Sequence, residues 1–357
     1  MRRLSIAAAV AAAALLAAGC GSSGSSGSSS STTGAANDSA AAPVTLRLGF
    51  LANITHASAL VGIKEGFFTK DLGSNVTLKL TPFSTGTEEG TALLAGQLDA
   101  AYVGPNPAIK AWQTSGGKLI KIISGAASGG AQLVVKSGIT SAAQLKGQSL
   151  ATPSLGNTQD VALRFWLKQH GLNTTTAGGG DVAIKPISPN SAAVLAFQSK
   201  QIAGGWEPAP YDAEMIADGG HVLVNEASLW PQGQFPTTNL VATQSFMAAH
   251  PSVINGLLKA QIEATGFISK NKAAAEQAAN TELATVNSGK NLKPDVLSAS
   301  FAQITFTNDP IAPALSTDVQ HAVSVGLLKP VSNLPGIYDL GPLNTLLQAA
   351  GEPQVNS

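Results

Sequence analysis

The sequence predicts an α/β protein in which mostly parallel sheets are flanked by helices. Two observations support this class. Short apolar or alternating stretches of strand character recur along the chain, and helical patterns of about ten residues separate them. Parallel neighbours need a crossover long enough to hold a helix, so strands that alternate with such helices favour parallel sheets. The roughly 310 residues that carry this pattern are long for one domain and comfortable for two.

The first 42 residues are expected to lie outside the folded body. Arg2 and Arg3 precede an apolar run that ends just before Cys20. At about 15 residues the run is shorter than the ~20 that span a membrane, so it indicates an export signal. Ala-Ala-Gly-Cys at 17–20 resembles a bacterial lipobox, although leucine is usual where Ala17 stands. We therefore expect residues 1–20 to be a lipoprotein signal with Cys20 as lipidation site; a plain signal peptide is the alternative.

Residues 21–42 consist almost entirely of Gly, Ser, Thr and Ala. Such a segment buries too little apolar surface to offset the entropy of ordering, which predicts a flexible tether. Together with the signal, it predicts a body held at the outer face of the cell membrane by a lipid alone.

Composition excludes several classes. The chain has 21 Lys and Arg against 21 Asp and Glu. It therefore has no net positive charge that would favour binding to nucleic acid. Cys20 is the sole cysteine, which leaves the body without disulfides or zinc-thiolate sites. The five histidines show no metal-ligand spacing, and no P-loop, G-x-S-x-G or H-E-x-x-H motif occurs. We expect no catalytic residue, no metal and no cofactor.

The first half of the body begins with alternating strands and helices. Thr85 and Glu88 have capping-box spacing at the start of the second helix. Asn106 is expected to cap a helix whose first residue is Pro107, a position where proline loses no hydrogen bond. The predicted strands are 44–50, 76–80, 98–103, 118–123 and 132–135, and the first two helices are 57–68 and 85–96.

The clearest helix is 157–170. Asn157 is its expected cap, Asp160 lies in its first turn, and Gly171 ends it. The same alternation then repeats, with strands at 181–187 and 202–206 around a helix at 191–200. Residues 251–288 are helical throughout, so the last third of the chain is expected to pack helices onto an existing sheet.

Five junctions between strands and helices share one chemistry. Each follows an apolar strand, opens a helix, and offers small or amide side chains beside unpaired backbone N–H groups. In open α/β sheets such loops meet at the carboxyl ends of the strands, where ligands bind, and helix N-termini suit anions. Ordinary helix capping is the alternative for any single loop. The five are residues 53–56, 83–87, 104–107, 154–158 and 188–191.

None of these five loops contains Lys or Arg. An anion would therefore be held by dipoles and hydroxyls, and His56 is the one group that could add positive charge; a satisfied neutral histidine is the alternative. Trp206 and Glu207 close another strand. Trp206 is either a stacking surface or core, and Glu207 either accepts an amine or is a solvated helix start.

Several motifs together resemble the solute-binding proteins of nitrate, sulfonate and taurine importers, over roughly residues 46–350. They are Leu-Val-Gly-Ile-Lys-Glu-Gly-Phe-Phe at 60–68, Leu-Ala-Gly-Gln-Leu-Asp-Ala at 94–100, Gly-Pro-Asn-Pro at 104–107, Leu-Lys-Gly at 145–147, Leu-Gly-Asn at 155–157, Gly-Leu at 171–172 and Gly-Trp-Glu-Pro at 205–208. Phe-Thr-Asn-Asp-Pro at 306–310 and Gly-Ile-Tyr-Asp-Leu at 336–340 resemble the aliphatic-sulfonate-binding branch.

The resemblance implies a two-lobed periplasmic-binding-protein-like fold of type II, with two crossing segments as a hinge. The crossings are expected near Gly129–Leu133 and Thr237–Val241. Residues 43–129 plus 241–357 would form lobe 1, and residues 130–240 lobe 2. The resemblance and the loops together give the expected ligand contacts: Thr55, His56, Thr85, Gly86, Asn106, Ser128, Gly156, Asn157, Thr158, Asn190, Trp206 and Glu207.

The function implied is that of a monomeric, lipid-anchored binding protein. It would deliver a small oxyanion to an ABC permease and its ATPase, with an alkanesulfonate or taurine as the favoured ligand. Nitrate, bicarbonate or a thiamine-pyrimidine precursor are alternative ligands, because binding proteins change ligand by loop substitution. A ligand-sensing lobe for a membrane receptor is another alternative. An enzyme of thiamine-pyrimidine synthesis shares the fold but needs a cysteine-rich motif that this chain lacks.

Overall fold

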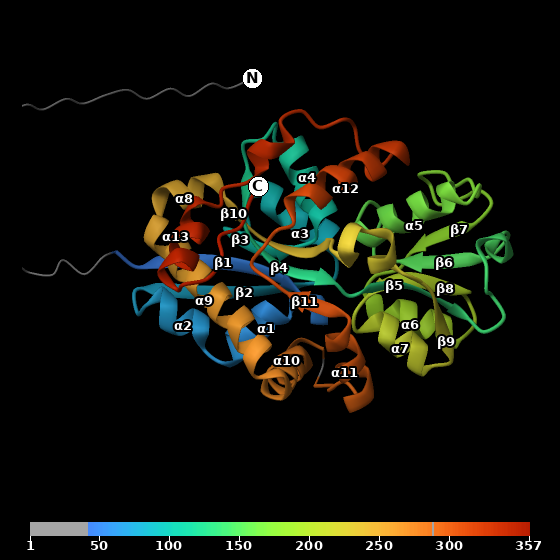
Figure 1. The fold of residues 1–357 in the computed structure, drawn as a ribbon, viewed down its shortest axis with the longest axis horizontal. Helices are drawn as coiled ribbons and strands as arrows, with labels where there is room; N and C mark the ends of the chain where they lie inside the picture. The colour runs from blue at the N-terminus through green and yellow to red at the C-terminus, as the bar shows by residue number, and fades with distance from the viewer. Residues whose placement is uncertain (1–41, 288) are drawn as a thin grey trace, which may run out of the picture. The chain divides into compact units, whose positions relative to one another are not determined.

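Two β-sheets organise the chain in the computed structural model, which describes residues 42–287 and 289–357 (Figure 1). Helices flank both sheets, and this confirms the predicted α/β class. The six-stranded sheet contains β1 (Val44–Leu51), β2 (Val76–Phe83), β3 (Ala100–Val103), β4 (Ile120–Gly129), β10 (Pro236–Thr243) and β11 (Ile304–Phe306). The five-stranded sheet contains β5 (Ala131–Lys136), β6 (Ser149–Thr152), β7 (Ala183–Pro186), β8 (Gly204–Pro208) and β9 (Gly220–Asn225).

Most strands of each sheet run in one direction, as predicted: β1 to β4 against β10 and β11 in the first sheet, and β6 to β9 against β5 in the second. The strand orders are β11-β4-β10-β3-β1-β2 and β7-β6-β8-β5-β9. β1 pairs in parallel with β2 and β3, and β6 with β7 and β8. β10 is antiparallel to β3 and β4, and β5 to β8 and β9. The cause is the path of the chain: β4 runs towards the second sheet and β10 runs back from it, so the two must oppose each other.

The chain passes between the sheets at two places. The first is Gly130, between β4 and β5, within the expected segment; Gly129 and Gly130 have φ of +82° and +80°, a conformation that favours glycine. The second is residues 226–235, with the 3-10 helices η3 (Glu226–Leu229) and η4 (Pro231–Gly233). The expected crossing at Thr237–Val241 instead lies inside β10.

The polar residues at the start of β10 explain this difference. Thr237, Thr238 and Asn239 have loop character in the sequence, but all three are buried in the strand. The Thr238 hydroxyl donates to the Thr55 carbonyl at 3.0 Å, which satisfies it inside the protein. Residues 236–240 thus belong to the six-stranded sheet. The division into two lobes stays a proposal, with its second boundary shifted to residues 226–235.

Helices cover both faces of the six-stranded sheet (Figure 1). α1 (Ala57–Lys64), α9 (Pro251–Lys270) and α10 (Lys272–Val286) pack on one face, where Leu48, Leu60 and Leu257 are buried together. α3 (Gly86–Leu94), α4 (Pro105–Thr114) and α12 (Ala312–Ser324) cover the other. Further elements are η1 (Ile54–His56), α2 (Phe67–Leu72), α8 (Gln244–Ala249), α11 (Pro294–Ala302), η5 (Leu334–Ile337) and α13 (Gly341–Ala349).

The five-stranded sheet is also covered on both faces. α5 (Thr158–Gln169) packs on one side, in a core that contains Trp166 and Trp206. α6 (Asn190–Gln198) and α7 (Tyr211–Ala217) lie on the other side, against Val134 of β5. The 3-10 helix η2 (Ala142–Leu145) precedes β6. The sheet thus carries the N-termini of α5 and α6 at the ends of its strands.

Two predicted helices are interrupted. The pattern at 57–68 is split into α1 and α2 by Gly66, whose φ of +75° is left-handed. The pattern at 251–288 is split into α9 and α10 at Asn271. Within the described residues, none of the helices combines the length and apolar character that crossing a membrane requires. The signal, the tether and Cys20 lie outside those residues.

Candidate ligand-binding pocket

A polar pocket lies where strands of both sheets end and helices begin. Its free volume is about 20 Å³, room for a single water molecule. Larger grooves, of about 580 and 640 Å³, lie along α9 and α13, and none of the five predicted loops lines either of them. The pocket is lined by Leu51, Asn53, Thr55, His56, Ser84, Thr85, Gly86, Gly104, Pro107, Pro153, Asn157, Thr158, Gln159, Asn190, Pro208 and Thr237.

Residues of the two sheets touch across this pocket. The hydroxyl oxygens of Thr87 and Ser154 are 2.8 Å apart. The Ile54 amide donates to the Ala209 carbonyl at 3.0 Å, and the Tyr211 hydroxyl donates to the Ala52 carbonyl at 2.9 Å. The structure is therefore closed around the pocket, and a polyatomic ligand needs these contacts to open before it can enter.

Four helix N-termini converge on the pocket, those of α3, α4, α5 and α6. Amides of a helix's first turn have no intrahelical acceptor, so each start brings free donors and partial positive charge. Thr85 Oγ1 accepts from the Glu88 amide at 3.2 Å, and Asn157 Oδ1 from the Asp160 amide at 2.9 Å. Both predicted caps are confirmed.

Asn106 does not cap α4 as predicted. The helix begins at Pro105 with Gly104 as its N-cap, so Asn106 already lies within the first turn. Its side chain is buried, and neither amide atom has a hydrogen-bond partner among the described residues. Gly104 is needed here, because a Cβ at this position would lie 2.7 Å from Thr158 Oγ1.

His56 is neutral in this structure. Its Nε2 lies 2.9 Å from the Tyr102 carbonyl, which can only accept, so Nε2 carries the proton. Nδ1 lies 3.2 Å from Thr55 Oγ1 and accepts from that hydroxyl. Burial lowers the pKa of His56 to about 3, while the bond to Tyr102 opposes the shift. The geometry thus supports a neutral His56 whose hydrogen bonds are satisfied within the protein, and not a positively charged ligand contact.

The structure brings seven of the twelve expected contact residues to the pocket wall. They are Thr55, His56, Thr85, Gly86, Asn157, Thr158 and Asn190. Asn106, Ser128, Gly156, Trp206 and Glu207 do not line it. Gly156 turns the loop, with φ +78°, and its amide donates to Asp160 Oδ2 at 2.9 Å.

Ser128 and Trp206 have structural surroundings. Ser128 Oγ accepts from the Phe235 amide at 3.2 Å, beside the second crossing. Trp206 is fully buried, stands edge-on to Trp166 with ring centroids 6.4 Å apart, and donates from Nε1 to Glu226 Oε2 at 2.6 Å. Of the two roles that the sequence left open for Trp206, these contacts favour core packing over ligand stacking.

Glu207 is buried directly beside the pocket residue Pro208. It is fully inaccessible to solvent, and neither carboxyl oxygen has a partner among the described residues. Burial raises the pKa of Glu207 well above its usual range, and Asp212 adds to the shift. The solvated helix start considered for this residue is therefore wrong. An unpartnered buried carboxyl is costly, which makes it a group that a donor would satisfy.

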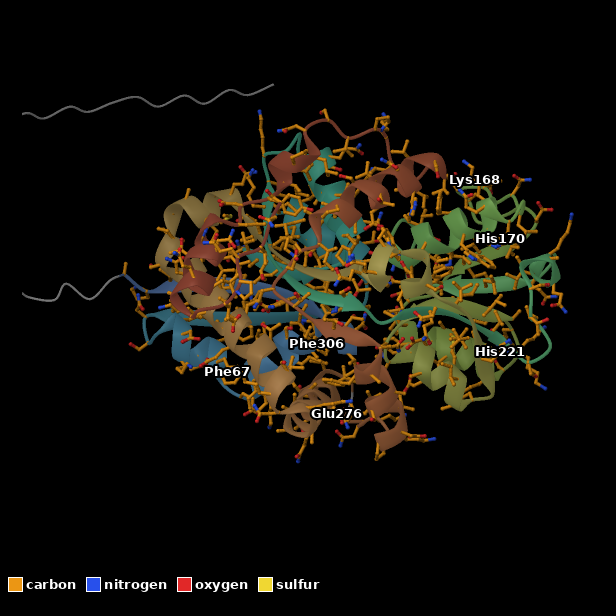
Figure 2. The ribbon with its side chains drawn as sticks, viewed as in Figure 1. Phe67, Lys168, His170, His221, Glu276 and Phe306 are labelled. Carbon is orange, nitrogen blue, oxygen red and sulfur yellow. The ribbon has the colours of Figure 1, made fainter. Side chains whose placement is uncertain are left out.

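Sequence reasoning missed Gln159 and Thr237 as pocket residues. Gln159 Oε1 accepts from Asn157 Nδ2 at 2.8 Å, and Thr237 was assigned to a crossing. Other histidines lie elsewhere: His170 follows α5 and His221 is in β9, both among the elements of the five-stranded sheet (Figure 2). In residues 42–287 and 289–357, no group of three metal-ligating side chains occurs.

Solved binding proteins have a similar fold. The alkanesulfonate-binding protein SsuA from Xanthomonas axonopodis pv. citri, bound to MOPS, matches 83% of this chain and 99% of its own, with a TM-score of 0.68 at 20% identity. The periplasmic nitrate-binding protein NrtA from Synechocystis PCC 6803 matches 87% of this chain and 90% of its own, with a TM-score of 0.73 at 17% identity. Both likenesses confirm the two-sheet fold that the sequence resemblance implied.

A sequence relative and a family complete the comparison. A protein of Brucella abortus (strain 2308), named as a candidate binding protein, is 26% identical over 231 residues, which are 64% of this chain and 68% of the relative. Residues 39–283 match the NMT1-like family, so the match runs from just before β1 through most of α10. The chain belongs to the NMT1-like family.

Proposed function

We propose that this protein is an extracytoplasmic solute-binding protein that captures a small oxyanion and delivers it to an ABC importer. An alkanesulfonate or taurine is the first candidate ligand. The fold shared with SsuA and NrtA, named for binding alkanesulfonate and nitrate, supports the class. Membership of the NMT1-like family and the ordered motifs of the sequence support it further.

The observation that carries the proposal is the lining of the pocket. Its residues include no Lys, Arg, Asp or Glu, and its single histidine is neutral. What remains is four helix starts, hydroxyls and side-chain amides. Helix N-termini bind anions through free amides and the helix dipole, so a singly charged oxyanion fits without an ion pair.

Taurine and simple alkanesulfonates differ in an ammonium group, and Glu207 distinguishes them. Its buried carboxyl lies beside Pro208 of the pocket wall and has no partner among the described residues. A ligand ammonium within reach would satisfy the carboxylate and lower its pKa. Glu207→Gln should therefore weaken taurine at least tenfold while changing ethanesulfonate less than threefold. Equal losses for both ligands would exclude this role.

Nitrate or bicarbonate is the second candidate ligand class. The closed pocket holds about 20 Å³, which favours an ion without a tail. No aromatic side chain other than His56 lines it, so a pyrimidine ring would have no flat apolar surface to stack on. A thiamine precursor is therefore disfavoured. A sensing lobe for a membrane receptor would use the same pocket chemistry and differs only in its partner.

A binding screen tests the proposal. Purified protein is mixed with ethanesulfonate, taurine, nitrate, bicarbonate and a thiamine-pyrimidine precursor, and thermal unfolding is followed. A cognate ligand at 100 times its dissociation constant stabilises the native state by about 2.7 kcal/mol through mass action. We expect that shift for one or more of the anions and none for the pyrimidine. A shift with the pyrimidine alone would contradict the proposed ligand class.

Attachment to the outer face of the cell membrane through Cys20 is a separate proposal. It rests on the signal-like segment before Cys20 and the Gly/Ser-rich tether after it. Cys20→Ala should release the protein from the membrane fraction, and Cys20→Ser, which also lacks the thiol, should do the same. A variant that sediments with membranes as the parent does would rule out a lipid at this residue. We propose a monomer, which light scattering tests.

A further inference from the structure

A buried ion pair lies directly behind the pocket loop of the five-stranded sheet. Asp160 Oδ2 and Arg164 Nε are 2.9 Å apart on successive turns of α5, and their side chains are 0% and 1% exposed. In every other ion pair of residues 42–287 and 289–357 at least one side chain is much more exposed. Burial of this kind is costly unless further hydrogen bonds satisfy the charges, so their partners matter.

Apart from the bond to Arg164, the side-chain hydrogen bonds and the capping bond of Asp160 lead to the pocket loop and its flanks. Oδ1 accepts from the Thr152 hydroxyl at 3.0 Å, at the end of β6. Oδ2 accepts from the Gly156 amide at 2.9 Å, and the Asp160 amide donates to Asn157 Oδ1 at 2.9 Å. Asp160 thus ties the strand end and the left-handed glycine together through its carboxylate, and the helix cap through its backbone amide. Pro153, Asn157 and Thr158, which line the pocket, lie between these fixed points.

The charge of Asp160 poses a problem for an anion. A carboxylate in the first turn stabilises a helix by interacting with the positive end of its dipole, and that same end is where an anionic ligand would bind. Alone, Asp160 would repel the ligand across a poorly screened interior. Arg164 offsets this charge from the next turn, and its Nη1 donates to the Thr175 carbonyl, which fixes the guanidinium.

We propose that Asp160 is a positioning residue for the pocket loop, and that Arg164 neutralises it so that the start of α5 can accept an anion. The role of Arg164 in anion binding rests on the proposed function, whereas the role of Asp160 in holding the loop does not. Two separable effects follow. Loss of the Asp160 carboxylate makes the pocket loop more mobile whether or not ligand is present. Loss of the Arg164 guanidinium lowers the affinity for anions.

The loop is tested without ligand. An amide at residue 160 offers one acceptor oxygen where the carboxylate offers two, so at least one donor loses its partner. Asp160→Asn should speed hydrogen exchange of residues 153–158 at least tenfold. The matched control is Asp181→Asn, since Asp181 is an exposed carboxylate on the same sheet that also accepts a backbone amide, from Asn173 at 2.9 Å.

Unchanged exchange of residues 153–158 in Asp160→Asn, relative to that control, would overturn the positioning role. If Asp160→Asn does not fold, Thr152→Val removes one of the three donors to the carboxylate and keeps the ion pair. We then expect exchange of the same segment to rise at least threefold. No rise in this milder variant would overturn the proposal as well.

The charge is tested by titration calorimetry with ethanesulfonate, taurine, nitrate and bicarbonate as probes. Arg164→Met should weaken the best-binding anion at least tenfold, because the carboxylate is left uncompensated. Asp160→Asn combined with Arg164→Met removes both charges and should return affinity to within threefold of the parent. Equal affinity in the parent and Arg164→Met, or no recovery in the double variant, would overturn the neutralising role. If the parent binds no probe, the proposed ligand class is wrong, and the exchange experiment alone decides the role of Asp160.

Discussion

The two sheets contribute to the pocket in different ways. The six-stranded sheet supplies residues held by neutral contacts: His56 between Thr55 and Tyr102, and Thr85 as the cap of α3. The five-stranded sheet supplies residues backed by buried charge, with Asp160 and Arg164 behind the loop and Glu207 beside Pro208. The pocket surface is uncharged on both sides, and each side has an unpartnered buried carboxyl near it, Glu89 of α3 and Glu207 of β8. Among the described residues, only the five-stranded side adds an ion pair in which both side chains are fully buried.

This contrast shows how a site can bind an anion without a cation in its wall. Donors come from helix starts on both sides, so attraction is shared by many partial charges. Buried carboxyls are tolerated on both sides: Asp160 is paired with Arg164, and Glu89 and Glu207 are held protonated, as their raised pKa values indicate. The following predictions test this difference between the sheets, first through single side chains and then through pH.

Removal of one member of the buried pair should have the largest effect on stability. Arg164→Met should lower the free energy of unfolding by about 3–5 kcal/mol, because an unpaired carboxylate is left inside the protein. The Lys146–Asp181 pair, 3.2 Å apart with Lys146 72% exposed, provides the control. Lys146→Met should cost at most about 1 kcal/mol. Urea unfolding measures both, and similar losses would contradict the distinction between buried and exposed pairs.

Core and pocket residues of the five-stranded sheet should respond in opposite ways. Trp206→Phe removes the donor to Glu226 and should cost about 1–3 kcal/mol of stability with unchanged ligand affinity. Asn190→Ala, at the pocket wall, should cost about 1–3 kcal/mol of binding with a smaller loss of stability. Calorimetry and urea unfolding separate the two quantities. Loss of affinity in Trp206→Phe would return this residue to the ligand site.

The two helix caps provide a matched pair, one from each sheet. Thr85→Ala and Asn157→Ala should each lower the free energy of unfolding by about 1 kcal/mol. Equal costs are expected because both side chains satisfy one first-turn amide. A much larger cost for Asn157→Ala would show that its bond to Gln159 carries additional weight.

The buried histidine and the buried carboxyls should give pH dependences of stability with opposite signs. Burial lowers the pKa of His56 to about 3, so its unfolded form binds more protons and stability rises with pH up to about 6.5. Burial raises the pKa of Asp212 to about 7 and that of Glu226 to about 8, so stability falls as pH rises from about 4 towards those values.

The net slope between pH 4 and 6.5 is expected to be a fall in stability as pH rises, because two carboxyls with raised pKa values outweigh the one histidine that opposes them. Single variants separate them in urea unfolding at several pH values. In His56→Gln the free energy of unfolding should fall as pH rises. In Glu226→Gln it should fall less steeply than in the parent. A profile unchanged in both variants would mean that these groups do not control the pH dependence of folding.

The sequence predicted the class, most strands and the pocket loops, because these depend on local signals. Alternation marks the strands, and Asn157 and Thr85 mark helix starts that the structure confirms. It misplaced the second crossing, because Thr237 and Thr238 are buried in a strand and their hydroxyls donate to carbonyls far away in the sequence. It also left the role of Trp206 undecided between core packing and ligand stacking. The hydrogen-bond partner of Trp206 is Glu226, twenty residues further along the chain, and no local sequence pattern indicates this contact.

Affinity as a function of pH tests the central claim most directly, namely that a neutral pocket holds an anion without a cationic side chain. Titration calorimetry would follow the best-binding anion of the screen from pH 7 to 8.5, with parent and His56→Gln side by side. A neutral His56 predicts a dissociation constant that stays constant within about threefold in the parent. A loss of tenfold or more across this range, abolished by His56→Gln, would show that a protonated histidine holds the ligand and would contradict the account.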